Sequence, residues 1–243
     1  MLLQLLLWIV GITSFTLFGA WYARRYQKPD ALIGLYVLFV AISQITAAKI
    51  ASYDLGFIVV TAPAAVLVYS VTYLFTDIVN ERFGRREVHR MIFIAFITQV
   101  AMLFFIWLAT ELAPAPFWEN QEMWETVFTL VPRITMASWV AFLISENLDA
   151  WIFDVFKKWT RGRHLWARNV FSSVPALTID TSLFVTLAFL GEMPVWSLME
   201  GQFLTKWLVG LVNIPFMYVN RWIMFGFIKG DDSVGRPVTG SVE

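Results

Sequence analysis

Long apolar runs separated by short charged clusters occupy almost the whole chain. A helix that crosses a membrane needs about 20 mostly apolar residues, and seven runs approach or exceed this length. They are Leu2–Trp21, Ala31–Ala48, Gly56–Phe75, Met91–Thr110, Pro132–Phe153, Asn169–Leu190 and Gln202–Phe227. This pattern predicts an all-α, polytopic membrane protein. Pro215, inside the long seventh run, is expected to kink that helix.

The charged clusters alternate in sign along the chain. The connections after the first, third, fifth and seventh runs are basic, and the others are acidic or nearly neutral. Because cytoplasmic loops carry the excess of Lys and Arg, we expect a multi-pass protein of the cytoplasmic (inner) cell membrane, with its N-terminus outside and its C-terminus in the cytoplasm. We expect an appended N-terminal transmembrane helix and basic loop (1–28), a six-helix core (29–229) and a flexible cytoplasmic tail (230–243).

The amino-acid composition argues against several kinds of partner and cofactor. Only 15% of the residues are charged, against roughly 25% in soluble domains, and the net charge is zero, so nothing indicates a nucleic-acid partner. The chain has no Cys and only two His, both in charged connections, so no metal site or cofactor is expected.

Between the fourth and fifth runs, Trp118, Trp124 and Phe128 lie among acidic residues and predict a short amphipathic helix on the outer surface.

Two carboxylates, Asp149 and Asp180, lie inside adjacent apolar runs. An ionisable group in hydrocarbon is costly and usually marks a ligand or ion path. Ser145 lies four residues before Asp149 and therefore on the same helix face, Glu146 is one turn from that acid, and Thr181 follows Asp180. These residues are candidates for one polar substrate pocket. In the alternative interpretation, the hydroxyls tighten helix packing and the acids form structural ion pairs. The cations available for such pairs are Arg133, Arg168 and Lys206.

A second polar group ends the third run. Asp77, Asn80 and Glu81 have the spacing i, i+3 and i+4, which puts them on one helix face. They are candidates for a cytoplasmic gate, together with Arg168, or for a solvated helix end. In the seventh run, Lys206 has the option of extending to the membrane surface, whereas Asn213 near the midplane is a further candidate for substrate contact.

Enzyme interpretations find little support. Two aspartates on neighbouring helices raise the alternative of an intramembrane aspartyl protease, but its Gly-x-Gly-Asp pattern is absent at Asp149 and at Asp180. The sequence contains no His-Glu-x-x-His, Gly-x-Ser-x-Gly or P-loop motif. We therefore expect no catalytic residues.

Four ordered blocks give the chain a family resemblance from about Ala31 to Phe227. The first block runs from Thr76-Asp77 through Asn80-Glu81-Arg82-Phe83-Gly84, and the second from Arg133 through Ser138, Ser145 and Leu148-Asp149 to Ile152-Phe153. The third runs from Ala167-Arg168-Asn169 through Asp180-Thr181 to Phe184, and the fourth from Lys206 through Pro215. In these blocks the chain resembles the queuosine precursor transporters, also called the vitamin-uptake-like (VUT) family. Glu146 stands where the family often has an amide, which adds a carboxylate near Asp149.

The resemblance implies a six-helix core similar to the substrate-binding components of energy-coupling-factor vitamin transporters, here with one extra N-terminal helix. It also implies import of 7-deazaguanines: the nitrile preQ0, the aminomethyl compound preQ1, or queuine. Independently, a carboxylate suits the paired N–H donors of a guanine-like edge, and a second acid suits an aminomethyl cation or carries a proton. The alternatives are a substrate-binding subunit, docked on an ATPase module, for another vitamin or nucleobase, and a membrane enzyme.

Overall fold

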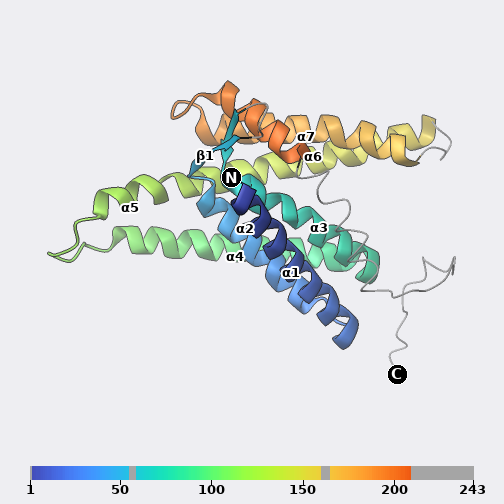
Figure 1. The fold of residues 1–243 in the computed structure, drawn as a ribbon, viewed down its shortest axis with the longest axis horizontal. Coiled ribbons are helices and arrows are strands. Elements are labelled where there is room, and N and C mark those ends of the chain that lie inside the picture. The colour runs from blue at the N-terminus through green and yellow to red at the C-terminus, as the bar shows by residue number, and fades with distance from the viewer. Residues whose placement is uncertain (1, 55–58, 160–164, 209–243) are drawn as a thin grey trace. The chain divides into compact units, whose positions relative to one another are not determined.

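The computed structural model describes residues 2–54, 59–159 and 165–208. Inside its helices, some side chains lie outside this description, among them those of Asp77, Glu81, Glu146, Asp149 and Arg168. The elements are α1 (Leu2–Tyr26), α2 (Asp30–Thr46), β1 (Ile50–Asp54), β2 (Val59–Pro63), α3 (Ala65–Phe83), α4 (Arg85–Glu111), α5 (Gln121–Phe128), α6 (Leu130–Trp159) and α7 (Leu165–Phe189) (Figure 1). A last described helix covers residues 195–208 and is called helix 195–208 below.

The helices follow the apolar runs, which confirms the predicted α-helical membrane protein. By length and composition, three of the described helical segments are able to cross a membrane: Leu6–Tyr26, Arg85–Glu111 and Gln121–Ser145. Shorter apolar helices cover Asp30–Thr46, Ala65–Asn80 and Val174–Phe189. The short helix expected between the fourth and fifth runs is α5. Pro215 and the rest of the seventh run beyond residue 208 lie outside the described residues, as does the predicted tail.

The third run differs from its prediction. Residues that the apolar pattern assigns to the start of a helix form β2, which pairs antiparallel with β1, and α3 begins only at Ala65. The physical reason lies in the segment from Val59 to Pro63. Its β-branched side chains favour a strand, and Pro63 disfavours the helical conformation of the residue before it. The helix therefore starts after the proline and continues to Phe83, past the predicted end.

The described residues form two compact units. The first contains α1, nearly all of α2 and most of α3 and α4. Its core is apolar and includes the fully buried Leu32, Phe75 and Met91. The indole N–H of Trp8 donates a hydrogen bond to the carbonyl of Leu67 (3.0 Å), so α1 is tied to α3 within this unit.

The second unit contains the hairpin, α5, α6, α7 and helix 195–208. Helices α6 and α7 run side by side and provide most of its packing (Figure 1). Ile134, Val185, Phe189 and Leu198 are buried in its core. Polar side chains are buried in the same unit, which is where the candidate site lies.

Candidate functional site

A buried ion pair joins α7 to helix 195–208. The ammonium of Lys206 lies 2.6 Å from Oδ2 of Asp180, and each residue is only 7% exposed. Asp180 stands nine residues before the end of α7, and no other charged residue lies in the helix after Arg168. A single helix cannot supply this arrangement, because the two charges come from separate apolar segments and meet only when those segments pack.

Two hydroxyl groups complete the cluster. Ser145 of α6 donates to Oδ1 of Asp180 (3.4 Å), and the Lys206 ammonium donates to Oγ1 of Thr181 (3.5 Å). Both hydroxyl residues are buried. Three helices therefore converge on one carboxylate, which we call the Asp180 cluster (Ser145, Asp180, Thr181 and Lys206). Since buried charges are tolerated only when paired and hydrogen-bonded, each member of the cluster reduces the cost of burying the others.

A further buried polar group lies one helical turn from the cluster. Gln202 is 4% exposed and precedes Lys206 by four residues, which puts both on one face of helix 195–208. Among the described residues, its carbonyl oxygen Oε1 has no hydrogen-bond donor. The neighbouring Gly201 packs so closely on the hairpin that an added Cβ would overlap the Thr61 carbonyl oxygen.

The profile of a family described as "Putative vitamin uptake transporter" matches residues 63–220, well over half of the chain. The chain belongs to this vitamin uptake transporter family. It is also 29% identical over 165 residues to the "Probable queuosine precursor transporter" of Bacillus subtilis (strain 168), which covers 66% of this chain and 72% of the relative. No solved structure matches the chain.

The region that matches the vitamin uptake transporter family contains the whole Asp180 cluster and Gln202. The names of the family and of the relative describe transporters rather than enzymes. Among the described residues, no group of three or more Asp, Glu or His side chains is arranged to hold a metal ion. The described side chains of the Asp180 cluster offer charge and hydrogen bonding.

The structure brings together four of the residues singled out in the sequence. Ser145, Asp180 and Thr181 lie together in the Asp180 cluster, and the substrate pocket expected for them stays a prediction. Lys206 joins them as the partner of Asp180 instead of extending along the helix to the membrane surface. The structural ion pair weighed as an alternative is thus present, with Lys206 as its cation.

Other predicted residues do not join the described cluster. Glu146 and Asp149 follow Ser145 along α6, but their side chains lie outside the description, and Asn213 lies beyond residue 208. Asp77, Asn80 and Glu81 all belong to α3, where Asn80 is exposed. Arg168 belongs to the first turn of α7.

Arg133 has a structural position at the opposite end of α7. Its guanidinium donates to the carbonyl oxygens of Leu187 (2.9 Å) and Leu190 (2.6 Å), and it lies 3.7 Å from the carboxylate of Glu192. The last carbonyls of a helix have no partner within the helix, and a cation there also interacts favourably with the helix dipole. Arg133 therefore caps α7 from α6.

Sequence reasoning missed Gln202, and it assigned Gln44 to an interhelical hydrogen bond without naming the partner. Gln202 was taken only as the first residue of the seventh run, although its spacing of four from Lys206 was the available signal. The amide of Gln44 donates to the hydroxyl of Ser138 (3.4 Å), which joins the end of α2 to α6. Burial of an amide depends on which helices pack together, and a single apolar run does not specify that.

The hairpin beside helix 195–208 has one group with a perturbed pKa. Burial raises the pKa of the Tyr53 hydroxyl from 10.0 to about 12. The hydroxyl donates to the carbonyl of Pro63 across the strand pair (3.4 Å). Tyr53 is therefore a neutral structural group at physiological pH.

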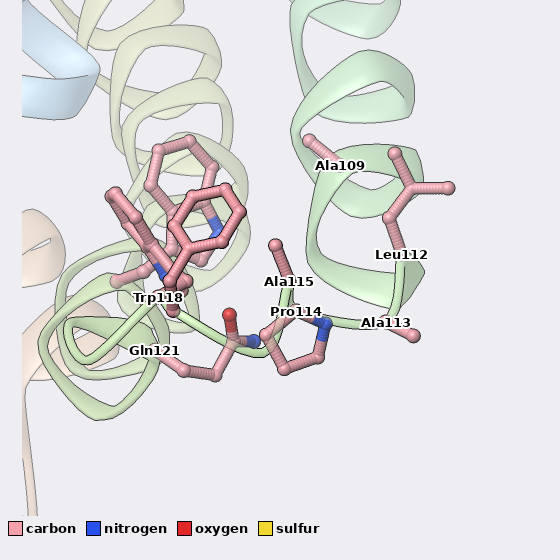
Figure 2. A pocket seen from close by; sticks show the side chains of 9 residues that line it. Ala109, Leu112, Ala113, Pro114, Ala115, Trp118 and Gln121 are labelled. Carbon is pink, nitrogen blue, oxygen red and sulfur yellow. The ribbon is translucent and has the colours of Figure 1, made fainter.

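A separate hollow of about 300 Å³ lies where α4 leads into α5 (Figure 2). Side chains at the end of α4, including Leu112, face Trp118 and Gln121 of the connection and α5. The indole N–H of Trp124 donates to the hydroxyl of Thr110 (3.2 Å) and holds α5 to α4. The lining is mostly apolar and contains no charged residue, so this hollow provides no group that recognises a charged ligand.

Proposed function

We propose that this protein imports a 7-deazaguanine precursor of queuosine across the cytoplasmic membrane. Two lines of support come from the family and from the name of the Bacillus subtilis relative. The observation that carries the proposal is the Asp180 cluster, a buried acceptor and donor held side by side among apolar helices.

The chemistry of the cluster suits a guanine-like edge. Such an edge presents a carbonyl acceptor beside an N–H donor and an exocyclic amine. The Lys206 ammonium is a donor for the carbonyl, and the Asp180 carboxylate accepts from both N–H groups. Adenine presents a ring acceptor and an amine in place of this pattern, so it would leave a buried charge without a partner. Sites built on buried hydrogen bonds discriminate strongly for this reason.

Discrimination within the 7-deazaguanines would require groups beyond the Asp180 cluster. Glu146 and Asp149 follow Ser145 within four residues of α6, and Asn213 follows Lys206 in the sequence. We propose that one of these acids pairs with the aminomethyl cation of preQ1 or carries a proton during transport. In this scheme Asp77, Asn80 and Glu81 contribute to a cytoplasmic gate at the end of α3.

Energy coupling has two forms that one experiment separates. A stand-alone importer would respond to the proton gradient, whereas a substrate-binding subunit would transport only with an ATPase module. Uptake is therefore measured with and without a proton uncoupler, and with and without co-expressed ATPase subunits. Loss of uptake with the uncoupler indicates the stand-alone importer, and uptake only with the ATPase subunits indicates the substrate-binding subunit. The lipid bilayer and a small heterocycle are the partners that the proposal itself requires.

The proposal is tested by ligand-induced thermal stabilisation of the detergent-purified protein. A ligand that binds only the folded state raises Tm as its concentration rises. We expect this with preQ0, preQ1 or queuine, but not with adenine. Asp180→Asn should abolish the shift, because the carboxylate acceptor is lost.

The matched control is Thr135→Val, which removes a fully buried hydroxyl of α6 that donates to the carbonyl of Val131 in its own helix (2.8 Å). Its ligand response should equal that of the wild type. A wild-type protein that none of the deazaguanines stabilises, or that adenine stabilises equally, would contradict the proposal.

A further inference from the structure

Gln202 precedes Lys206 of the Asp180 cluster by one helical turn, and its buried carbonyl oxygen has no donor from the described part of the chain. A buried acceptor without a partner costs folding free energy, and native proteins contain few of them. Such a group has an explanation when a ligand supplies the missing donor. Gln202 lies on the helix face that carries Lys206, one turn away, so it is close enough to contact a ligand held at that cluster.

The packing of the neighbouring residue fixes Gln202 in place. An added Cβ on Gly201 would overlap the carbonyl oxygen of Thr61, so helix 195–208 and β2 are in direct backbone contact there. Thr205, on the next turn, donates its hydroxyl to the Gly201 carbonyl (2.6 Å) and is buried. The backbone contact between Gly201 and Thr61 holds helix 195–208 against β2, and it opposes a small rotation that would expose the Gln202 oxygen to a solvent donor.

We infer that Gln202 is a specificity-determining residue whose Oε1 accepts the pyrrole N–H of a free deazaguanine base. The inference rests on the proposed function and adds a prediction to it. A 7-deazaguanine base has three sets of N–H donors: the ring N1–H, the exocyclic amine and the pyrrole N–H at N9. The Asp180 carboxylate accounts for the first two, which leaves the pyrrole N–H for the unpaired oxygen of Gln202.

The consequence is a preference for free bases over nucleosides. A ribosyl or methyl group at N9 removes the donor and leaves Gln202 again without a partner. The site would therefore take free bases and reject their N9-substituted forms, a distinction that Asp180 and Lys206 do not make.

The test measures binding of two ligands to the full-length purified protein. The ligands are preQ0 and its N9-methyl derivative, and the variants are wild type, Gln202→Met and Thr205→Val. Met keeps the length and unbranched shape of Gln but has no acceptor oxygen. Thr205→Val is the matched control. It also replaces a buried polar residue of helix 195–208 by an apolar one, but the hydroxyl that it removes bonds only to Gly201 of the same helix.

We expect wild type and Thr205→Val to bind preQ0 about tenfold more tightly than N9-methyl-preQ0. Gln202→Met should lose this preference, with weakened binding of preQ0 and unchanged binding of the N9-methyl compound. Its Tm without ligand should be equal to or above that of wild type, because the unsatisfied oxygen is gone.

Three results would overturn the inference on Gln202. One is unchanged preQ0 binding in Gln202→Met, another is equal weakening of both ligands, and the third is a wild type that does not distinguish them. A wild-type protein that binds neither compound contradicts the proposed function itself, so the two failures are distinguishable.

Discussion

Asp180 and Lys206 each carry a charge that would be costly to bury alone. Apolar residues of similar volume commonly replace a buried ion pair at no cost in stability, or even with a gain. Stability alone therefore gives little reason for this pair to lie among apolar helices. Recognition of a polar heterocycle gives a reason, since the pair presents a donor and an acceptor 2.6 Å apart.

Single and double substitutions of the pair separate its structural contribution from its functional one. Asp180→Asn or Lys206→Met alone leaves one buried charge unpaired, and each should lower the free energy of unfolding by about 3–5 kcal/mol. The double variant leaves no charge and should recover most of this loss. Denaturation in detergent measures the free energies, and ligand binding by the folded double variant should be absent. A double variant that still binds deazaguanine would show that the pair is only structural.

At the residue scale, the sequence allowed us to predict which polar side chains are functional candidates, but not which of them contact one another. Asp180, Ser145 and Thr181 were identifiable because an ionisable group inside an apolar run is unusual, and hydroxyls lie near it. Lys206 was one of three cations considered for an ion pair, but which of them pairs with Asp180 was not predictable, because spacing within one helix says nothing about the rotation of another. Gln202 was missed for the same reason, since its burial follows from how closely Gly201 approaches β2.

At the element scale, the hairpin and helix 195–208 form the least expected contact. The segment ending at Pro63 is apolar enough to be taken for a membrane-spanning helix, but its β-branched residues and the proline favour a strand. Hydrophobicity alone does not distinguish these outcomes over so short a run. The strand then packs on Gly201, where the missing side chain allows backbone contact.

Gly201→Ala should test this contact. Because the new Cβ would overlap the Thr61 carbonyl, the helix and β2 must separate, and we expect a loss of about 1–3 kcal/mol in unfolding free energy. Gly34→Ala is the control: it lies on an exposed face of α2 with nothing within 4 Å, and it should stabilise by about 0.5–1 kcal/mol. Thermal unfolding of both variants provides the comparison. Equal stabilisation of the two would rule out the close approach.

Arg133 should matter through α7 rather than through substrate. Arg133→Met removes the donors to Leu187 and Leu190, and we expect a loss of about 1–2 kcal/mol with unchanged ligand selectivity. Glu192→Gln removes only an exposed ion pair and should change stability by less than about 0.5 kcal/mol. Ligand affinity and Tm measured on both variants separate capping from recognition. A change in base selectivity in Arg133→Met would contradict the capping assignment.

At the scale of the whole molecule, the apolar runs predicted a helical membrane protein, and the alternating charges predict how it is oriented. Helix α4 has 27 residues and is therefore about 40 Å long, enough to cross a bilayer from one surface to the other. The orientation follows from loop charges and not from the packing of the helices, so the structure leaves it as a prediction.

The absence of cysteine makes the orientation directly measurable. Single Cys substitutions at two exposed residues provide the probes: Arg86 in the first turn of α4, and Glu119 beyond its C-terminal end. A membrane-impermeant maleimide should label Glu119→Cys in intact cells, and Arg86→Cys only after permeabilisation. The reverse pattern would place the N-terminus in the cytoplasm and contradict the positive-inside assignment.

The central claim is import of a deazaguanine that the Asp180 cluster recognises. Its most direct test is uptake of radiolabelled preQ0 by host cells that neither synthesise nor import the compound, expressing wild type or Asp180→Asn/Lys206→Met. We predict that cells with the wild type take up labelled preQ0, and that an excess of unlabelled preQ0, but not of adenine, inhibits this uptake. Cells with the folded double variant should show no uptake. Wild-type uptake no higher than that of cells without the protein, or equal uptake by the double variant, would contradict the account.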